Sequence, residues 1–338
     1  MFKTKTAFLS LLLSFSLFLF AINSIYGGAF AFINPFFYVY YGVASILLFS
    51  IMGPASAIPI ALSFSVAVGI IAGYYGTGIN SGYLGYHVLG RFFISVAIVQ
   101  FLVFIAIPYF FSYLISKGYG FTKSICYPVI AVFVIFFSIA ALHIFAGKIN
   151  IISSINYFSG IMTKKLADTY NRMGMKYLAT LKMQKLIFKM LKFVFLLLPS
   201  VLIIFSWLSI WISFIFLKKI SKKTNRFFYG LKENLLLWRA SDYFLIFLIA
   251  GIAVSVFSFG LYKFIGYNII LLSSSVYLVQ GLTVVAFVFN KFNANIFLRI
   301  LGYGIIFIFG NPLLIFIIMT GIFDMWFNFR KIEIKKGG

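Results

Sequence analysis

Residues 193–217 read FVFLLLPSVLIIFSWLSIWISFIFL, and this stretch decides the fold. It contains no charged side chain, and Lys192 and Lys218 flank it directly. A helix needs roughly 20 apolar residues to cross the hydrocarbon core of a bilayer. The stretch is longer than that, so we predict a transmembrane helix here.

Similar apolar runs recur along the whole chain. The first, at 7–25, follows Lys3 and Lys5; its length and the lack of a small-x-small cleavage site favour a retained span over a signal peptide. The other runs lie at 36–52, 57–75, 92–115, 124–145, 243–264, 268–290 and 296–323. We therefore expect an all-α fold, a polytopic bundle of about eight or nine transmembrane helices. The count depends on the tight link at 53–56, which joins either two short spans or one re-entrant pair.

The composition supports the same solvent. Hydrophobic residues make up 63% of the 338 residues and charged residues only 10%, whereas a soluble domain carries about 25% charged residues. Most of the surface is therefore expected to face lipid. We predict one integral membrane domain over 1–338, with an N-terminal group of spans at 1–145, a basic segment at 146–192 and a C-terminal group at 193–338.

The charge is strongly unbalanced, with 28 basic against 5 acidic residues and a formal net charge of +23. On a soluble chain this balance would suggest nucleic acid. Here the basic residues lie mainly in loops and at the ends of spans, where lysine and arginine side chains reach the headgroups or hold loops on the cytoplasmic side. We therefore expect a multi-pass protein of a bacterial cytoplasmic membrane, with the lipid bilayer and not nucleic acid as its partner.

Two basic segments interrupt the apolar pattern. Residues 146–192 hold nine basic residues and one acid, Asp168, and their apolar residues recur every three or four positions. This pattern predicts an amphipathic helix near 150–190 in a basic interfacial setting, either a surface helix that covers the bundle or a partner-binding helix. Residues 218–239 predict a cytoplasmic loop. No simple span count places every basic loop inside, so the side on which 146–192 lies stays open.

Few polar groups lie within the apolar runs, and each is a candidate for function. Asp324, near the end of the last run, is predicted to pair with Arg330 or Lys331. Two interpretations of this pair stay open: it is part of a functional site, or it is an interfacial anchor beside an aromatic belt of Trp326 and Phe327. Pro199 lies inside its run and requires neighbours that satisfy the backbone carbonyl it frees.

Four amide side chains are the candidate ligand-binding groups: Gln100, Asn268, Gln280 and Asn311. The competing interpretation is hydrogen bonding between helices, worth about 0.6 to 2 kcal/mol for each bond in a membrane. Small residues also indicate where helices touch. Gly251 and Ser255 have the spacing that allows two backbones to approach closely inside one bundle.

Nothing in the sequence indicates a catalytic centre, a metal site or a cofactor. Cys126 is the single cysteine and His87 and His143 are the two histidines, which leaves too few ligands for zinc, haem or an iron–sulfur cluster. The five acids are scattered, and the glycine-rich stretches lack the lysine of a P-loop. We expect a protein that is not an enzyme.

The C-terminal part of the chain carries a family resemblance. Residues 277–285 read YLVQGLTVV, the last run ends in GIFDMWFNFRK at 321–331, and LLP occurs at 197–199. Together these motifs resemble the YybS-like family of bacterial membrane proteins, over the chain from Leu197 onward. In this pattern the Gln280-Gly281 pair lies within a span, and Asn328 stands where an acidic residue is expected.

That family is distantly similar to the substrate-capture subunits of energy-coupling-factor transporters. The resemblance implies a helical bundle that binds a small molecule, as yet unknown, and docks on an energising module with an ATPase. In those subunits small residues four apart line the docking helix, and Ser10 and Ser14 have this spacing. A second hypothesis of another class is a non-catalytic membrane scaffold or regulator, which recruits partners through basic residues such as Lys164, Lys165 and Arg172.

Overall fold

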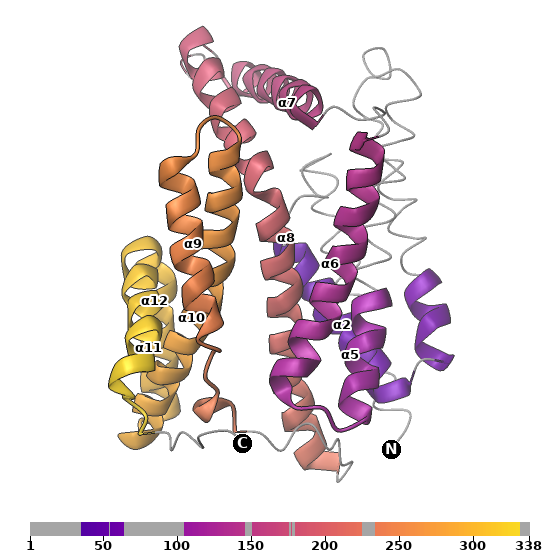
Figure 1. The fold of residues 1–338 in the computed structure, drawn as a ribbon, viewed down its shortest axis with the longest axis vertical. Helices are drawn as coiled ribbons and strands as arrows, with labels where there is room; N and C mark the ends of the chain where they lie inside the picture. Colours follow the sequence, from indigo (N-terminus) through magenta and orange to yellow (C-terminus); the bar gives the residue numbers. More distant parts are fainter. Residues whose placement is uncertain are drawn as a thin grey trace. The chain divides into compact units, whose positions relative to one another are not determined.

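The computed structural model describes residues 35–53, 55–63, 105–145, 151–175, 177, 180–224 and 234–331 (Figure 1). Within these ranges the regular structure is helical and contains no strand. The prediction of an all-α fold is therefore confirmed for this part of the chain. Gln100, Ser10 and Ser14 lie outside the described ranges.

The chain forms two compact units, and each combines separate stretches of sequence. The first unit comprises residues 1–146 and 202–232, and the second comprises 147–201 and 233–338. Helix α8 (Leu181–Thr224) therefore begins in the second unit and ends in the first. The expected grouping, in contrast, follows the order of the chain.

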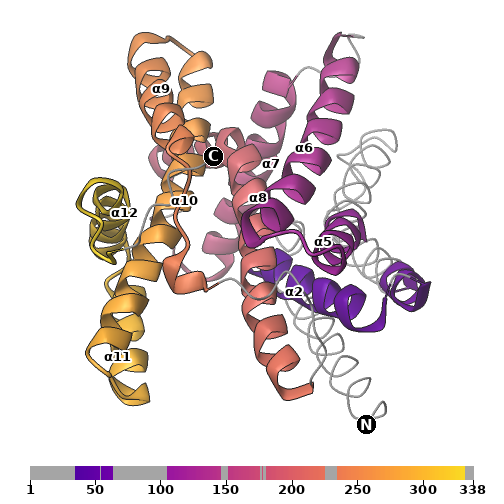
Figure 2. The same cartoon turned by 60° about the horizontal axis from the view of Figure 1, so that its bottom comes forward.

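In the first unit, a side-chain hydrogen bond and a pair of aromatic rings hold helices together. The described helices of this unit include the second half of α8, α2 (Pro35–Met52), α5 (Ile107–Ser116) and α6 (Phe121–Phe145), and residues 55–63 are helical as well. Helix α5 packs against both α2 and α6 (Figure 2), and Ser112 Oγ donates a hydrogen bond to the Phe49 carbonyl oxygen at 3.2 Å. The buried rings of Phe121 and Phe214 meet edge to face with centroids 4.5 Å apart, which ties α6 to α8.

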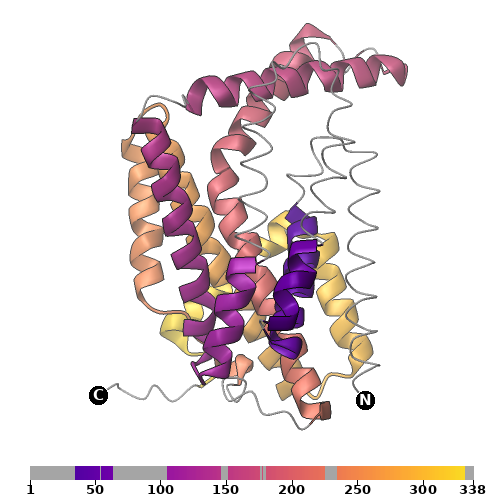
Figure 3. The same ribbon diagram turned by 90° about the vertical axis from the view of Figure 1, so that its right-hand side faces the viewer.

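The second unit is organised around one long helix, α10. Its other described elements are the first half of α8 and α7 (Ile151–Arg172), η5 (Leu235–Leu237), α9 (Tyr243–Phe257), α11 (Ile296–Ile308) and α12 (Gly310–Phe327). Helix α10 (Tyr262–Lys291) packs against α9, α12 and η5, so the core of the unit lies along its length. Helix α7 runs crosswise to α9 and α10 (Figure 3).

Small residues allow α9 and α10 to approach closely, as the sequence predicted. A Cβ atom added at Gly266 of α10 would lie 2.7 Å from the Gly251 carbonyl oxygen and 2.8 Å from Ser255 Cα. Such separations leave no room for a side chain at position 266. Gly251 and Ser255 therefore serve packing inside the unit, in agreement with the small-residue spacing.

The last apolar run, 296–323, forms two helices and not one continuous helix. Helix α11 ends at Ile308, and α12 begins at Gly310, whose φ of +38° lies in the left-handed region that favours glycine. Pro312 follows in the first turn of α12, where its missing N–H costs nothing. The hydropathy of the run is continuous, so it did not reveal this break.

The basic segment is also two helices where one was predicted. Helix α7 ends at Arg172, Gly174 has a φ of +77°, and the next helix, α8, begins at Leu181. A glycine in the left-handed conformation is a common end for a helix. The apolar spacing of three and four residues continues through the turn, which is why it predicted one helix. The first twelve residues of α8 thus belong to the same continuous helix as the apolar stretch 193–217.

Two of the described helices are long and apolar enough to cross a membrane, Leu181–Ile220 of α8 and Tyr262–Lys291 of α10. Shorter apolar helical stretches of 10–17 residues also occur in the described ranges, among them Phe121–Val134 of α6 and Pro312–Phe327 of α12. A buried helix of a soluble protein meets the same criteria of length and composition. The predicted count of eight or nine spans therefore stays a prediction.

Candidate functional site

A buried polar cluster lies where α10, α12 and the segment around η5 meet. It consists of Gln280 and Thr283 on α10, Asp324 on α12 and Arg330 just beyond α12. The exposed fraction of each residue lies between 0 and 4%. At such burial each polar group needs a hydrogen-bond partner from the protein or from ordered water.

Arg330 supplies most of the bonds in this cluster. Its Nε donates to Asp324 Oδ2 at 3.1 Å, and its Nη2 donates to the same oxygen. Its Nη1 donates to Thr283 Oγ1 at 3.0 Å and to the carbonyl oxygens of Leu236 and Trp238, each at 2.8 Å. One guanidinium therefore balances a buried carboxylate and satisfies two carbonyl groups of the η5 segment.

Gln280 and Arg239 complete the attachment of the η5 segment. Gln280 Nε2 donates to Asp324 Oδ2 at 3.2 Å, and Gln280 Oε1 accepts a hydrogen bond from the Ala240 N–H at 3.0 Å. Arg239 Nη2 donates to the Met325 carbonyl oxygen at 3.0 Å. The cluster therefore acts as a clamp that fixes residues 236–240 against α10 and α12.

The structure thus assigns the partner of Asp324. Of the two cations that the sequence offered, Arg330 forms the ion pair, and Lys331 is exposed. Trp326 and Phe327 are 61% and 69% exposed. The carboxylate is buried although its aromatic neighbours lie on the surface of α12.

Asn268 joins α10 to α8 beside Pro199. Its Oδ1 accepts from the Ser200 N–H at 3.0 Å, and its Nδ2 donates to the Leu196 carbonyl oxygen at 2.9 Å. In a regular helix those two backbone groups would bond to each other, because the donor lies four residues after the acceptor. The amide therefore inserts into the ladder of α8 one residue after Pro199.

Asn268→Leu is expected to destabilise the protein, because it leaves the Ser200 N–H and the Leu196 carbonyl without the partner they have now. We expect a loss of about 1 to 2 kcal/mol in the free energy of unfolding. The measurement is denaturation in mixed micelles, with the exposed Asn290→Leu on the same helix as control. Equal stability of the two variants would contradict this role of Asn268.

The remaining candidates are placed as follows. Gly281 lies at the crossing of α10 and α12, where an added Cβ would overlap the Ile317 carbonyl oxygen. The side chain of Asn311 lies outside the described part of the structure. Gln280 and Asn268 both use their amides within the protein, in the manner of the interhelical hydrogen bonds that were the alternative interpretation.

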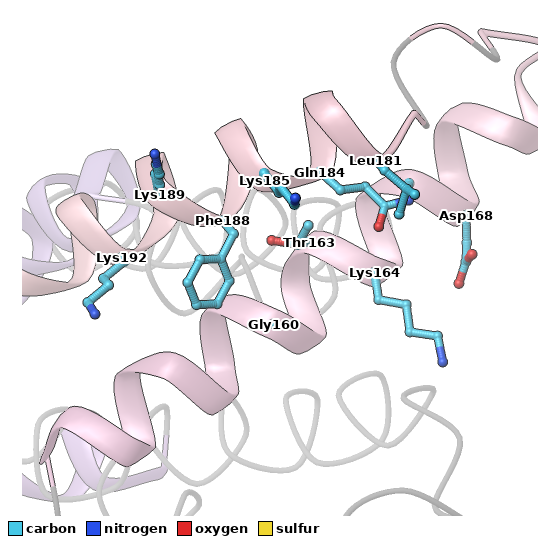
Figure 4. Close-up of a pocket in the computed structure, with 11 residues that line it drawn as sticks. Gly160, Thr163, Lys164, Asp168, Leu181, Gln184, Lys185, Phe188, Lys189 and Lys192 are labelled. Carbon is cyan, nitrogen blue, oxygen red and sulfur yellow. The ribbon is translucent and has the colours of Figure 1, made fainter.

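A lysine-lined pocket lies between α7 and the first three turns of α8 (Figure 4). Its cavity volume is about 760 Å³, within the roughly 300 to 1,000 Å³ typical of small-molecule sites. Helix α7 lines it with Gly160, Thr163, Lys164, Ala167 and Asp168. Helix α8 lines it with Leu181, Gln184, Lys185, Phe188, Lys189 and Lys192.

The pocket forms because each helix presents one face to it. The α8 residues follow one another every three or four positions, which places them along one side of that helix. On α7 the small residues Gly160 and Ala167 leave space, and a Cβ added at Gly160 would meet no heavy atom within 4 Å. The cavity is therefore a consequence of missing side-chain volume on α7 opposite the long side chains of α8.

The pocket carries a clear excess of positive charge. Four lysines line it, Lys164, Lys185, Lys189 and Lys192, against the single acid Asp168. Clustered cations in a concave, partly apolar site raise the local concentration of anions. Sequence reasoning singled out Lys164 but missed the three lysines of α8, although their spacing of four and three residues places them on one helical face.

In the described part of the chain, no three His, Cys, Asp or Glu side chains form a group that could hold a metal ion. The pocket offers the ammonium groups of four lysines, the Asp168 carboxylate, the Thr163 hydroxyl, the Gln184 amide and apolar side chains.

Residues 42–325 match the protein family described as "Predicted membrane protein (DUF2232)". The chain belongs to this family. No curated protein and no solved structure matches the chain. The match covers the whole lysine pocket and most of the buried cluster, whereas Arg330 lies beyond it. Membership supports a membrane location for the protein, and the family description names no activity.

Proposed function

We propose that this DUF2232 protein is a non-catalytic, multi-pass protein of the cytoplasmic membrane that binds an anionic partner through the lysine-lined pocket. The observation that carries the proposal is that four lysines from two helices line one cavity. The protein would then act as a scaffold or regulator that holds this partner at the membrane surface.

The position of the pocket in the sequence supports this role. It lies in the basic segment 146–192, and its α8 part directly precedes the apolar stretch 193–217 of the same helix. A basic amphipathic element next to a span is the usual arrangement for binding anions at a membrane surface. The hypothesis of partner recruitment through Lys164 thus gains a defined cavity.

A second candidate is a substrate-capture subunit of an energised transporter, which draws on the YybS-like resemblance. In this reading a small molecule lies among the helices and an ATPase module binds from the cytoplasm. The contacts of Gln280 and Asn268 argue against these two amides as ligand groups, because both are engaged with backbone or side chains of the second unit.

The two candidates differ in what accompanies the protein. We would extract the full-length protein gently from its own membrane and identify bound species by native mass spectrometry. Our proposal expects an anionic species that is lost in Lys185→Gln/Lys189→Gln and retained in Lys165→Gln/Lys182→Gln. The control also removes two positive charges, one from α7 and one from α8, at positions that do not line the pocket. Equal retention in both variants would contradict the proposal, and a stoichiometric ATPase module would favour the capture subunit.

Binding through the pocket should also depend on ionic strength. Raising the salt from about 0.1 M to 1 M shortens the Debye length from about 10 Å to 3 Å and screens exposed lysines. We expect the retained fraction of the anionic species to fall over this range. A retained fraction that does not change with salt would indicate that apolar contacts and not the lysines hold the species.

A further inference from the structure

We infer that the occupant of the α7–α8 pocket is the phosphate-bearing headgroup of an anionic phospholipid. This inference rests on the proposed function, because it names the chemical class of the anionic partner. Three observations carry it: the depth of the pocket relative to the apolar part of α8, its charge, and the apolar surface at one end.

The depth follows from the geometry of α8. Lys192 is the last charged residue before the uncharged stretch 193–217, and both belong to one unbroken helix. At 1.5 Å per residue that stretch is about 37 Å long, enough to cross a hydrocarbon core of about 30 Å. Lys185 and Lys189 lie about 10 Å and 5 Å further out along the same axis. The pocket lysines are therefore at the level of the lipid headgroups.

The charge matches a phosphate group. An ammonium group is a compact point charge that binds phosphate oxygens from any direction, and it carries three N–H donors. Four lysines and one acid, Asp168, line the cavity. A zwitterionic headgroup would bring its own cation into this excess of positive charge. An anionic headgroup without such a cation is therefore the better match.

The apolar surface distinguishes a lipid from a soluble anion. Phe188 and Leu181 line the pocket together with the lysines, and Phe193, one helical turn after Lys189, is 47% exposed. An acyl chain attached to a phosphate in the pocket would continue along this surface toward the hydrocarbon core. Free phosphate or an acidic peptide would leave it uncovered.

Gly160 provides a test that leaves every charge in place. Because an added Cβ meets nothing within 4 Å, Gly160→Leu fills the cavity without a clash at the Cβ atom, and it replaces glycine within a helix by a better helix former. The variant should fold at least as well as the wild type and should exclude the headgroup. Thr169→Leu on α7, outside the pocket lining, is the matched control.

The experiment uses full-length protein in nanodiscs that contain phosphatidylglycerol and phosphatidylcholine in equal amounts. Lipids that remain bound after ejection from the nanodisc are counted by native mass spectrometry. The wild type is expected to retain phosphatidylglycerol selectively. Lys185→Gln/Lys189→Gln should lose this preference by roughly 30-fold, from about 1 kcal/mol for each lysine near a membrane surface. Gly160→Leu should lose it as well, and both control variants should keep it.

The outcomes separate this inference from the proposed function. Equal retention of the two lipids by the wild type would overturn the inference. If the native membrane then still yields an anionic species that depends on Lys185 and Lys189, the proposed function stands with a soluble or protein partner. If that species contains no lipid and millimolar inorganic phosphate displaces it, the partner is a free anion. Retention of phosphatidylglycerol by Gly160→Leu would show that the lipid binds outside the pocket and would also overturn the inference.

Discussion

Arg330→Gln is expected to be among the most destabilising single substitutions in the second unit, with a loss of about 3 to 5 kcal/mol in the free energy of unfolding. The substitution leaves the Asp324 carboxylate buried without its counter-charge. It also removes the donor for the carbonyl oxygens of Leu236 and Trp238. Breaking a buried pair from one side is costly because an uncompensated charge stays in the interior.

The measurement is unfolding of the purified protein in mixed micelles, with Lys331→Gln as the matched control. Lys331 is the next residue and carries the same charge, but it is exposed. The double variant Asp324→Asn/Arg330→Gln should lose clearly less than the sum of its two single variants, because it leaves no unpaired charge. If Arg330→Gln lowers the free energy of unfolding no more than Lys331→Gln does, the cluster does not act as a clamp.

Gly281→Ala is expected to lower stability by about 1 to 3 kcal/mol, although it adds a single methyl group. The new Cβ would overlap the backbone carbonyl oxygen of Ile317 on α12, and a backbone atom cannot rotate away as the end of a side chain can. Gly321→Ala should act in the same direction, since its Cβ would overlap the Tyr277 carbonyl oxygen. Relief of either overlap requires α10 and α12 to separate.

The matched control is Gly160→Ala, the same substitution within a helix but into open space. There we expect no loss, or a gain of about 0.5 to 1 kcal/mol from the lower conformational freedom of alanine. Opposite signs for positions 281 and 160 would establish that the helix crossing, and not helix propensity, decides the outcome. A stabilising effect of Gly281→Ala would contradict the close approach of α10 and α12 at this position.

The sequence predicted those features of the protein that depend on residues close together along the chain. Apolar runs predicted helices because the hydrocarbon core excludes charge, and the described part of the chain is helical throughout its regular structure. The spacing of Gly251 and Ser255 predicted a close helix contact, which α9 and α10 make. Asp324 and Arg330 are near enough in sequence for an ion pair to be predicted.

The breaks between helices were the main errors. Gly174 and Gly310 each lie at a break between two helices, although the apolar pattern of the sequence continues across the break. Hydropathy and apolar spacing average over several residues, so neither responds to one backbone in the left-handed conformation. Two predicted single helices were therefore each two helices.

The sequence by itself determined the solvent, the helical class and the charge balance of this protein, because these depend on composition and on contacts within one or two turns. Only the tertiary structure decided that Gln280, 44 residues from Asp324, and Arg330 both donate to Asp324 Oδ2. The same holds for the hydrogen bonds of the Asn268 amide to the backbone of α8. The tertiary structure also decided that three lysines of α8 and Lys164 of α7 line one cavity. These arrangements depend on how helices pack, and the packing is set by side-chain volumes that lie far apart along the chain.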